Sequence, residues 1–248
     1  MSQFALKLIA LVAMLTDHIA HVLVTHKLLD PVIGARCVYW LRTGMLAFGR
    51  MAFPVFAWFL AEGCRHTSDK RRYLLRLLLF ALISEAPFRL CFGYNWFGCL
   101  NVIFTMLFAA SAIFSGQWLS DRFSLNWLFL PPALAAILLG WFLKSDYGGW
   151  GAALAILLYC MPRKDLRIAA LGLWCVIFYL GVRSFNGKTF GWLTPNAPGY
   201  LLFFAGGMLA VLLLTFYNGK RGRSGKWLFY WFYPLHLLAI FGVSCLLK

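Results

Sequence analysis

Long apolar stretches follow one another along the chain, separated by short segments that carry most of its polar residues. A helix needs about 20 mostly apolar residues to cross the hydrocarbon core of a bilayer. The pattern therefore predicts an all-α, polytopic transmembrane helix bundle, and the short linkers indicate a single transmembrane domain over residues 1–248. The nine predicted spans are 4–24, 46–64, 73–92, 99–118, 126–143, 147–162, 166–183, 199–217 and 227–247. The segment 25–45 is long enough to hold a re-entrant or interfacial helix, or a tenth span.

Composition favours a bilayer environment over water. The chain is 62% apolar and only 12% charged, whereas soluble domains are about a quarter charged and about half apolar. A soluble fold would leave too much of this apolar surface exposed to water. An ordinary soluble domain is therefore excluded.

The net charge of +15 arises from basic residues grouped in short loops beside apolar helices. This placement is typical of the positive-inside rule and of contact with anionic lipid head groups. No nucleic-acid-binding motif accompanies the charge, so we expect no nucleic-acid partner. Loops 65–72, 119–125, 162–167 and 218–226 hold twelve Lys or Arg, and the alternate loops hold five. The asymmetry predicts a multi-pass protein with a cytoplasmic N-terminus.

Two compositional features suggest chemistry but are better explained by packing. The seven cysteines include no Cys-x-x-Cys motif, so we expect small apolar fillers of helices rather than a zinc or redox site. Cys91 and Cys99 flank one short loop, and a disulfide between them stays open. The run Gly148–Gly151 (GGWG) is typical of close helix packing rather than of phosphate binding.

Ionisable residues inside the predicted spans are the clearest candidates for function, because charge at bilayer depth is costly. These residues are Lys7, Asp17, His18, His21, Arg50, Glu62, Arg76, Glu85, Arg89 and His236, with Asn101 and Asp146 at span ends. Helical geometry places Lys7, His18 and His21 on one stripe, which also includes Thr25 and has Asp17 at its edge. Such a stripe should face the interior of the bundle. We expect Asp17 to pair with Arg50 or His21, because adjacent residues on a helix point about 100° apart.

Depth brings several of these groups together in the outer half of the membrane. With a rise of about 1.5 Å per residue, His18 lies roughly 20 Å from the inner end of its helix, and His236 lies near the middle of the last span. Glu85 and Arg89 lie in the outer half of theirs. A lone membrane histidine more often forms a helix–helix hydrogen bond, but two of them with carboxylates and arginines at similar depth favour a functional site.

Two other interpretations of the intramembrane polar residues are simpler. The set His18, His21 and Asp17 lacks a complete metal-ligand pattern, so we expect no metal. Glu62 and Arg76 lie near the inner surface, where they can pair with each other or extend toward the head groups.

Several strings along the chain resemble one family. Asp17-His18-Ile19 on the first span resembles the Asp-His-Ile of the TraX family, and Gly49–Ala57 (GRMAFPVFA) is similar to that family's Gly-Arg-x-Ala-Phe-Pro-x-Phe-Ala. His66-Thr67, Asn101 and Tyr147-Gly148 also match. Phe232–Leu237 (FYPLHL) resembles the family's closing Phe-Tyr-x-x-His-Leu. The match extends from residue 5 to about 245, and the second string is its most specific part.

The resemblance implies a function, since TraX proteins are associated with N-terminal acetylation of conjugative pilin and are distantly similar to the membrane acyltransferase-3 group. Lys7 and His18, separated by ten residues, are similar to that group's Arg/Lys-x10-His, in which the histidine is the proposed catalytic residue. The group's Arg-x-x-Arg motif is not matched, because Arg72 and Arg76 are four residues apart.

From this resemblance we expect a bacterial inner-membrane enzyme that transfers acetyl from cytoplasmic acetyl-CoA to an extracytoplasmic acceptor. The acceptor is a pilin or other protein N-terminus, a glycan or a lipid. His18 would act as general base or acyl relay. The expected catalytic residues are His18, Asp17 and His236; those for the acceptor are Arg50, Glu85, Arg89, Asn101, Asp146 and Tyr147; and those for acetyl-CoA are Lys7, Arg65, Lys70, Arg71, Arg72 and Arg76. A developing oxyanion would be stabilised by Arg50, Asn101 or His236.

Two other classes stay open. A small-solute or proton-coupled transporter also places His, Asp and Arg near the middle of the membrane, although no inverted repeat is visible. A membrane scaffold would leave the intramembrane ionisable residues without a reason.

Overall fold

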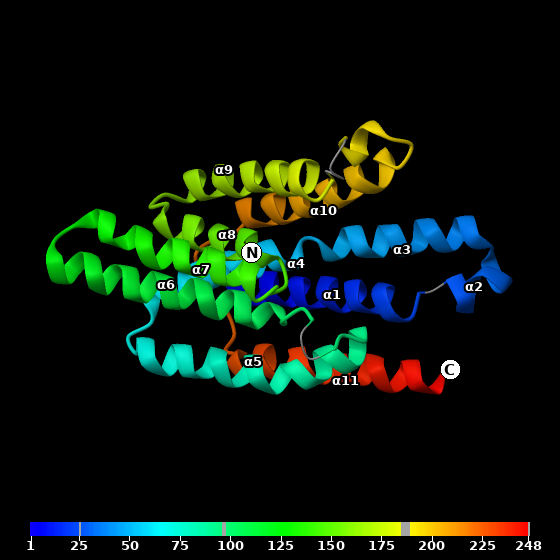
Figure 1. The fold of residues 1–248 in the computed structure, drawn as a ribbon, viewed down its shortest axis with the longest axis horizontal. Helices are drawn as coiled ribbons and strands as arrows, with labels where there is room; N and C mark the ends of the chain where they lie inside the picture. Colours follow the sequence, from blue (N-terminus) through cyan, green and yellow to red (C-terminus); the bar gives the residue numbers. More distant parts are fainter. Residues whose placement is uncertain (25, 96–97, 185–188, 248) are drawn as a thin grey trace. The chain divides into compact units, whose positions relative to one another are not determined.

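The computed structural model describes residues 1–24, 26–95, 98–184 and 189–247, and this part of the chain is all-helical, without a strand. The all-α fold class is therefore confirmed. The helices, which can be followed in Figure 1, are α1 (Gln3–Val22), α2 (His26–Ile33), α3 (Ala35–Gly49), α4 (Ala52–His66), α5 (Lys70–Phe92), α6 (Val102–Phe123), η1 (Asn126–Phe129), α7 (Leu130–Phe142), α8 (Gly148–Cys160), α9 (Lys164–Cys175), η2 (Val176–Val182), η3 (Gly191–Leu193), α10 (Ala197–Thr215) and α11 (Lys226–Leu246).

Six helical runs in the described chain are long and apolar enough to cross a membrane. They are Gln3–Val22, Ala35–His66, Val102–Phe123, Lys164–Val182, Ala197–Thr215 and Lys226–Leu246. Two further apolar helical runs, Asn126–Phe142 and Gly148–Cys160, are shorter. The predicted third span forms a helix, α5, which is rich in basic residues at its start. The structure thus supports a polytopic membrane protein, while the number of nine or ten spans stays a prediction.

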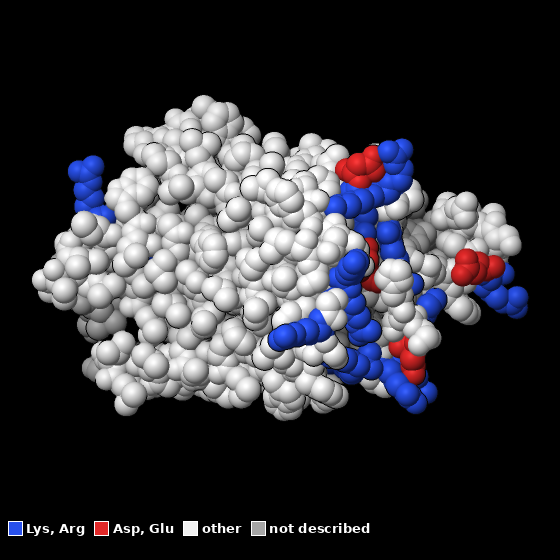
Figure 2. Space-filling model, turned by 180° about the vertical axis from the view of Figure 1, so that it is seen from behind, with Lys and Arg blue, Asp and Glu red and all other residues white. Residues whose placement is uncertain are grey.

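The surface also suits lipid. Large areas of the face shown in Figure 2 carry no Lys, Arg, Asp or Glu. Along α7, Leu134, Leu138 and Trp141 are each more than half exposed, and Phe142 is 82% exposed. Apolar side chains at such density are unfavourable in water and favourable in hydrocarbon. The exposed apolar surface therefore fits a protein embedded in a bilayer.

The segment 25–45, which the hydropathy pattern left without a predicted span, contains helices α2 and α3. The predicted span 46–64 is interrupted at Arg50 and Met51, where α3 ends and α4 begins. The sequence left this segment open to a further helix, and α3 begins within it although Arg36 and Arg42 lower its apolar character. Arg42 is accommodated inside the fold, where its Nε donates to the carbonyl of Ala20 at 3.2 Å.

The chain forms two compact units. The first comprises residues 1–56 and 168–248, and the second comprises 57–167. Helices α4 and α9 each begin in one unit and end in the other. The prediction of a single domain is not tested by this division, and each unit is described separately below.

In the first unit, α1 packs closely on α3, as Figure 1 shows, and also on α11. Gly49 of α3 lies against the side chain of Asp17, so a Cβ at that position would overlap the carboxylate. Gly206 of α10 similarly lies against the backbone carbonyl of Ala47. Both contacts need glycine, because small residues allow helices in a membrane to approach closely.

In the second unit, α6, α7 and α8 pack against one another, and α5 packs on α6. A short bridge between Leu100 and Ser145 fastens the two loops that precede α6 and α8. Gly140 of α7 lies against the backbone of Gly148 and Gly149, which leaves no room for a side chain. The predicted packing role of the glycine-rich run is therefore confirmed.

Candidate functional site

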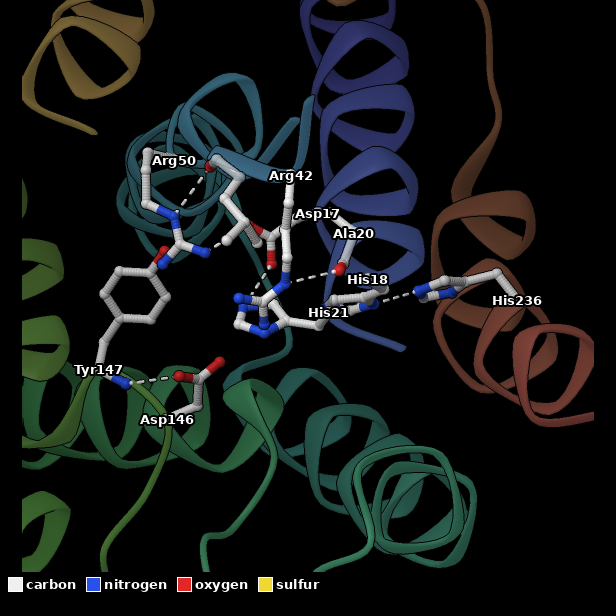
Figure 3. A network of polar contacts seen from close by, with 10 residues as sticks. Asp17, His18, Ala20, His21, Arg42, Arg50, Asp146, Tyr147 and His236 are labelled. Atoms are coloured by element: carbon white, nitrogen blue, oxygen red, sulfur yellow. Dashed lines mark hydrogen bonds and ion pairs between the residues drawn. The ribbon is translucent and has the colours of Figure 1, made fainter. Parts of the chain in front are cut away.

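A pair of histidines lies between α1 and α11 in the first unit. Nδ1 of His18 and Nε2 of His236 are 2.7 Å apart, a hydrogen-bond distance, although the two residues are 218 positions apart in the sequence (Figure 3). Their ring planes are nearly parallel, 9° apart, and the centroids are 4.9 Å apart. The two helices thus bring together the two predicted catalytic histidines.

The pair is held in place by aromatic residues of α11. The Phe232 ring stacks on that of His236 with centroids 4.9 Å apart, and the Tyr233 ring lies edge-on to both imidazoles. Nδ1 of His236 lies 2.7 Å from the carbonyl oxygen of Phe232. The side chain of His236 is buried, with 6% exposure, and each of its ring nitrogens lies within hydrogen-bond distance of a protein group.

Asp17 and Arg50 form a second pair beside the histidines. The Arg50 guanidinium donates to Oδ1 of Asp17, and each side chain is only 14% exposed. Nε2 of His21, on the next turn of α1, lies 3.8 Å from Oδ2 of Asp17. The predicted pairing of Asp17 with Arg50 and with His21 is therefore confirmed. Asp17 does not serve as a direct partner of His18, because the adjacent side chains point in different directions (Figure 3).

Arg50 occupies the break between α3 and α4, and several groups fix it there. Its Nε donates to the carbonyl of Leu46 at 3.1 Å, and its guanidinium lies over the Phe203 ring, 5.8 Å from the centroid. Its own carbonyl accepts a hydrogen bond from the Tyr179 hydroxyl at 3.2 Å. Breaking the helix frees backbone groups that then need such partners.

Tyr179 belongs to η2, a π-helical turn, and was not among the predicted site residues. Gly207 of α10 gives space to its ring. The wider π-helical geometry is rare in proteins and occurs often at functional sites. Hydropathy does not report this geometry, so the sequence offered no signal for Tyr179.

Lys7 lies near the start of α1, where it faces the start of α11. Its ammonium group is over the ring of Phe229, 5.3 Å from the centroid. His18 is eleven positions further along the chain, which corresponds to roughly 16 Å along the helix. Lys7 is thus a neighbour of the basic loop 218–226, whose residues Lys220 and Arg221 accept backbone hydrogen bonds from the start of α1. Thr25, predicted on the same stripe, lies outside the described residues.

A separate cluster in the second unit joins three predicted residues. Arg89 pairs with Glu85 at 2.5 Å, and Nδ2 of Asn101 donates to Oε2 of Glu85 at 2.6 Å and to the carbonyl of Ala81 at 2.8 Å. Oδ1 of Asn101 accepts from the backbone of Ile103 and so caps α6. These hydrogen bonds connect α5 to the start of α6 and give the cluster a structural role.

Asp146 and Tyr147, also predicted for the acceptor, lie at the start of α8. Oδ1 of Asp146 accepts from the backbone N–H of Tyr147 at 3.0 Å (Figure 3). The carbonyl of Asp146 accepts from the Thr105 hydroxyl at 2.5 Å. Tyr147 adopts a left-handed conformation with φ 61°, which few non-glycine residues do. This tight turn anchors α8 to α6.

The basic residues of the second unit differ in their partners. Arg65 donates to the carbonyls of Leu158, Tyr159 and Met161 at the end of α8. A cation there complements the negative end of the helix dipole. Lys70 contacts Gln117 at 3.4 Å, Arg72 pairs with Asp69 at 3.0 Å, and Arg71 is exposed.

Arg76 shares a buried, unpartnered Nε with Arg89 and Arg167 but has no carboxylate partner among the described residues. Arg50, Arg89 and Arg167 each pair with a carboxylate, and Glu62 pairs with Arg167 rather than with Arg76. Nε of Arg76 is buried and has no hydrogen-bond partner in the described part of the chain. Of the two alternatives predicted for Glu62 and Arg76, the mutual pair is therefore wrong, because α9 brings Arg167 to that carboxylate instead.

Metal and disulfide sites are not evident among the described residues. No group of three His, Cys, Asp or Glu gathers there. All seven cysteines are free thiols, Cys91 and Cys99 included.

Fold and site define a polytopic membrane protein that is all-helical in its described part and has a histidine pair between two of its helices. Comparison with known proteins is more specific: the family model "TraX protein" matches residues 2–244, so the chain belongs to the TraX family. It is also 27% identical to a "Probable fimbrial assembly protein FimC, serogroup H1" of Dichelobacter nodosus, over all of this chain and 97% of that protein. No solved structure matches the chain significantly.

Proposed function

We propose that this protein is a membrane acyltransferase that moves an acetyl group from cytoplasmic acetyl-CoA to an amine or hydroxyl outside the cytoplasm. The observation that carries the proposal is the hydrogen-bonded pair His18–His236, held inside the protein by α1 and α11. Family membership and the fimbrial name of the relative favour a pilin N-terminus as acceptor, with a glycan or a lipid as the alternatives.

His18 is the general base of the proposed reaction. Imidazole is the side chain whose unperturbed pKa, about 6.5, allows proton transfer near neutral pH. As His18 takes a proton from the acceptor, the acceptor's nitrogen or oxygen attacks the thioester carbonyl. The carbon–sulfur bond then breaks, the thiolate leaves and is protonated, and the products are an acetylated acceptor and CoA. In the variant mechanism, His18 carries the acetyl group between the two partners.

Basic residues at the inner ends of the helices are proposed to hold the donor's phosphates. Arg76 is one candidate, because its Nε is buried without a hydrogen-bond partner in the described part of the chain and could donate to an anionic ligand. Lys70, Arg71 and Arg72 precede it on α5. In the unit that carries the histidines, the basic loop 218–226 is hydrogen-bonded to the first turn of α1. Lys7 lies on the next turn of that helix.

The pair Asp17–Arg50 is proposed to shape the acceptor side. Arg50 lies at an interrupted helix, and a cation fixed by several hydrogen bonds is a preorganised donor of the kind that stabilises a developing oxyanion. Glu85, Arg89 and Asn101 contact one another and connect α5 to α6, so we assign them to the support of α6 rather than to contact with the acceptor.

The experiment uses membranes from cells that produce the protein, labelled acetyl-CoA supplied to the cytoplasmic face, and a pilin as acceptor. We expect label at the pilin N-terminus with the wild type and none with His18→Ala. Val12→Ala is the matched control, because Val12 lies on the same helix and is 52% exposed. Equal labelling by wild type and His18→Ala would refute His18 as the base.

A transporter is the second candidate, and the interrupted helix at Arg50 is the observation that favours it. Broken helices with ionisable residues are a feature of transporter binding sites. Vesicles distinguish the two classes: solute accumulation that depends on Asp17, without any acetylated product, would favour the transporter.

A further inference from the structure

We infer that His236 is a positioning residue that fixes the proton of His18 on Nδ1, so that Nε2 of His18 is the nitrogen that does the chemistry. The inference rests on the proposed function for its role in acetyl transfer. Its structural part, the tautomer of the pair, can be tested without any activity.

The first step concerns the backbone carbonyl of Phe232. A carbonyl oxygen only accepts hydrogen bonds, and it lies 2.7 Å from Nδ1 of His236. Nδ1 of His236 must therefore carry a proton. A positive charge is costly at bilayer depth, so we take the resting His236 as neutral; only one of its ring nitrogens is then protonated, and Nε2 is an acceptor.

The second step concerns the hydrogen bond from His236 to His18 on α1. Nε2 of His236 is 2.7 Å from Nδ1 of His18, and two lone pairs at that distance would repel each other. Nδ1 of His18 must donate. The neutral His18 ring is then protonated on Nδ1 and carries its lone pair on Nε2. The Phe232 carbonyl thus determines which nitrogen carries the proton in both rings.

The arrangement also suits a base that must become positively charged. When Nε2 of His18 accepts a proton from the acceptor, the Nδ1 proton can shift within the hydrogen bond, whose nitrogens are 2.7 Å apart, to Nε2 of His236. The charge then lies on His236, whose Nδ1–H still donates to the Phe232 carbonyl, and the proton count is unchanged. A second group that orients and supports a catalytic imidazole in this way is a recurring device in enzymes.

The surroundings of His236 fit a positioning role rather than contact with a substrate. Its side chain is 6% exposed, and the Phe232 and Tyr233 rings contact its imidazole. His18 is more accessible, since it is only partly buried. The other charged and titratable groups nearby include Asp17, which contacts both Arg50 and His21.

Three substitutions at residue 236 separate positioning from packing. In His236→Gln the amide oxygen can occupy the place of Nε2 and still accept from His18, so we expect acetyl transfer within about tenfold of the wild type. In His236→Asn the side chain is too short to reach His18, and in His236→Phe the ring is kept but the acceptor is lost. For both we expect a decrease of roughly 10²-fold or more, the usual contribution of a well-placed base. His236→Phe at wild-type rate would overturn the positioning role.

Nitrogen NMR of ¹⁵N-histidine-labelled protein in bilayers provides the readout that packing alone would not move. Protonated and unprotonated ring nitrogens have distinct shifts, and the His18 signals are assigned from their loss in His18→Ala. We expect Nδ1-protonated His18 in the wild type and in His236→Gln, and a redistributed tautomer in His236→Phe. A wild-type His18 protonated on Nε2 would overturn the inference. If the wild type shows the expected tautomer but transfers no acetyl group, the proposed function fails and the tautomer assignment stands.

Discussion

Replacing Asp17 with alanine is expected to destabilise the first unit strongly, because it leaves the Arg50 guanidinium inside the protein without its carboxylate. Both side chains are 14% exposed, so the pair belongs with buried ion pairs, for which loss of one partner costs about 3–5 kcal/mol. The remaining hydrogen bond from Arg50 to Leu46 places the expected loss toward the lower end, about 3 kcal/mol.

The measurement is the free energy of unfolding in mixed micelles, from titration with a denaturing detergent and followed by circular dichroism. The double variant Asp17→Asn/Arg50→Gln removes both charges and should lose less stability than the sum of its single variants. Asp165→Asn is the control for an exposed pair, since Asp165 and its partner Arg163 are 59% and 72% exposed, and we expect no measurable change.

A result in which Asp17→Ala unfolds at the wild-type detergent concentration would refute the reasoning. So would additive losses in the double variant, because additivity would mean that Asp17 and Arg50 do not interact. Either result would also remove the support for an acceptor side shaped by this pair.

Three further predictions concern other parts of the chain. Arg76→Gln should raise the KM for acetyl-CoA about tenfold with little change in kcat, because one charge-assisted contact to a phosphate is worth about 1.5–3 kcal/mol. Steady-state kinetics measures this change, with Arg122→Gln as an exposed basic control. An unchanged KM would exclude Arg76 from donor binding. Tyr179→Phe should lower the free energy of unfolding by about 0.5–1.5 kcal/mol through the lost hydrogen bond to the interrupted helix, and a stability equal to the wild type would show that this bond contributes nothing. Gly206→Leu should reduce the folded yield in membranes through overpacking worth about 1–3 kcal/mol or more, whereas Gly242→Leu, which meets open space, should not; equal yields would contradict the close approach of α10.

Three contacts of the first unit meet at Arg50, in the break between α3 and α4. Arg50 donates to Asp17 of α1, its carbonyl accepts from Tyr179 of η2, and its guanidinium lies over the Phe203 ring of α10. A sequence string that resembles a family motif therefore coincides with the position where three other elements meet. Substitution at any of these contacts should change the same local structure, so their effects should be non-additive.

The amino-acid sequence by itself determined the helical class, the membrane environment and the two histidines as candidates. These features depend on properties that are local along a chain: the length of apolar stretches, the spacing of residues on one helix and the cost of charge at bilayer depth. His18 and His236 could be singled out for this reason, and Asp17 could be assigned a partner other than its neighbour.

Only the tertiary structure decided which helices meet. It joined His18 to His236, paired Glu62 with Arg167 instead of Arg76, and placed helix α3 in a segment whose arginines lower its apolar character. Such pairings depend on how helix surfaces fit together, and hydropathy carries no record of that fit. The direction of the proton in the histidine pair is the clearest case, since it follows from a backbone carbonyl and two distances that no residue pattern contains.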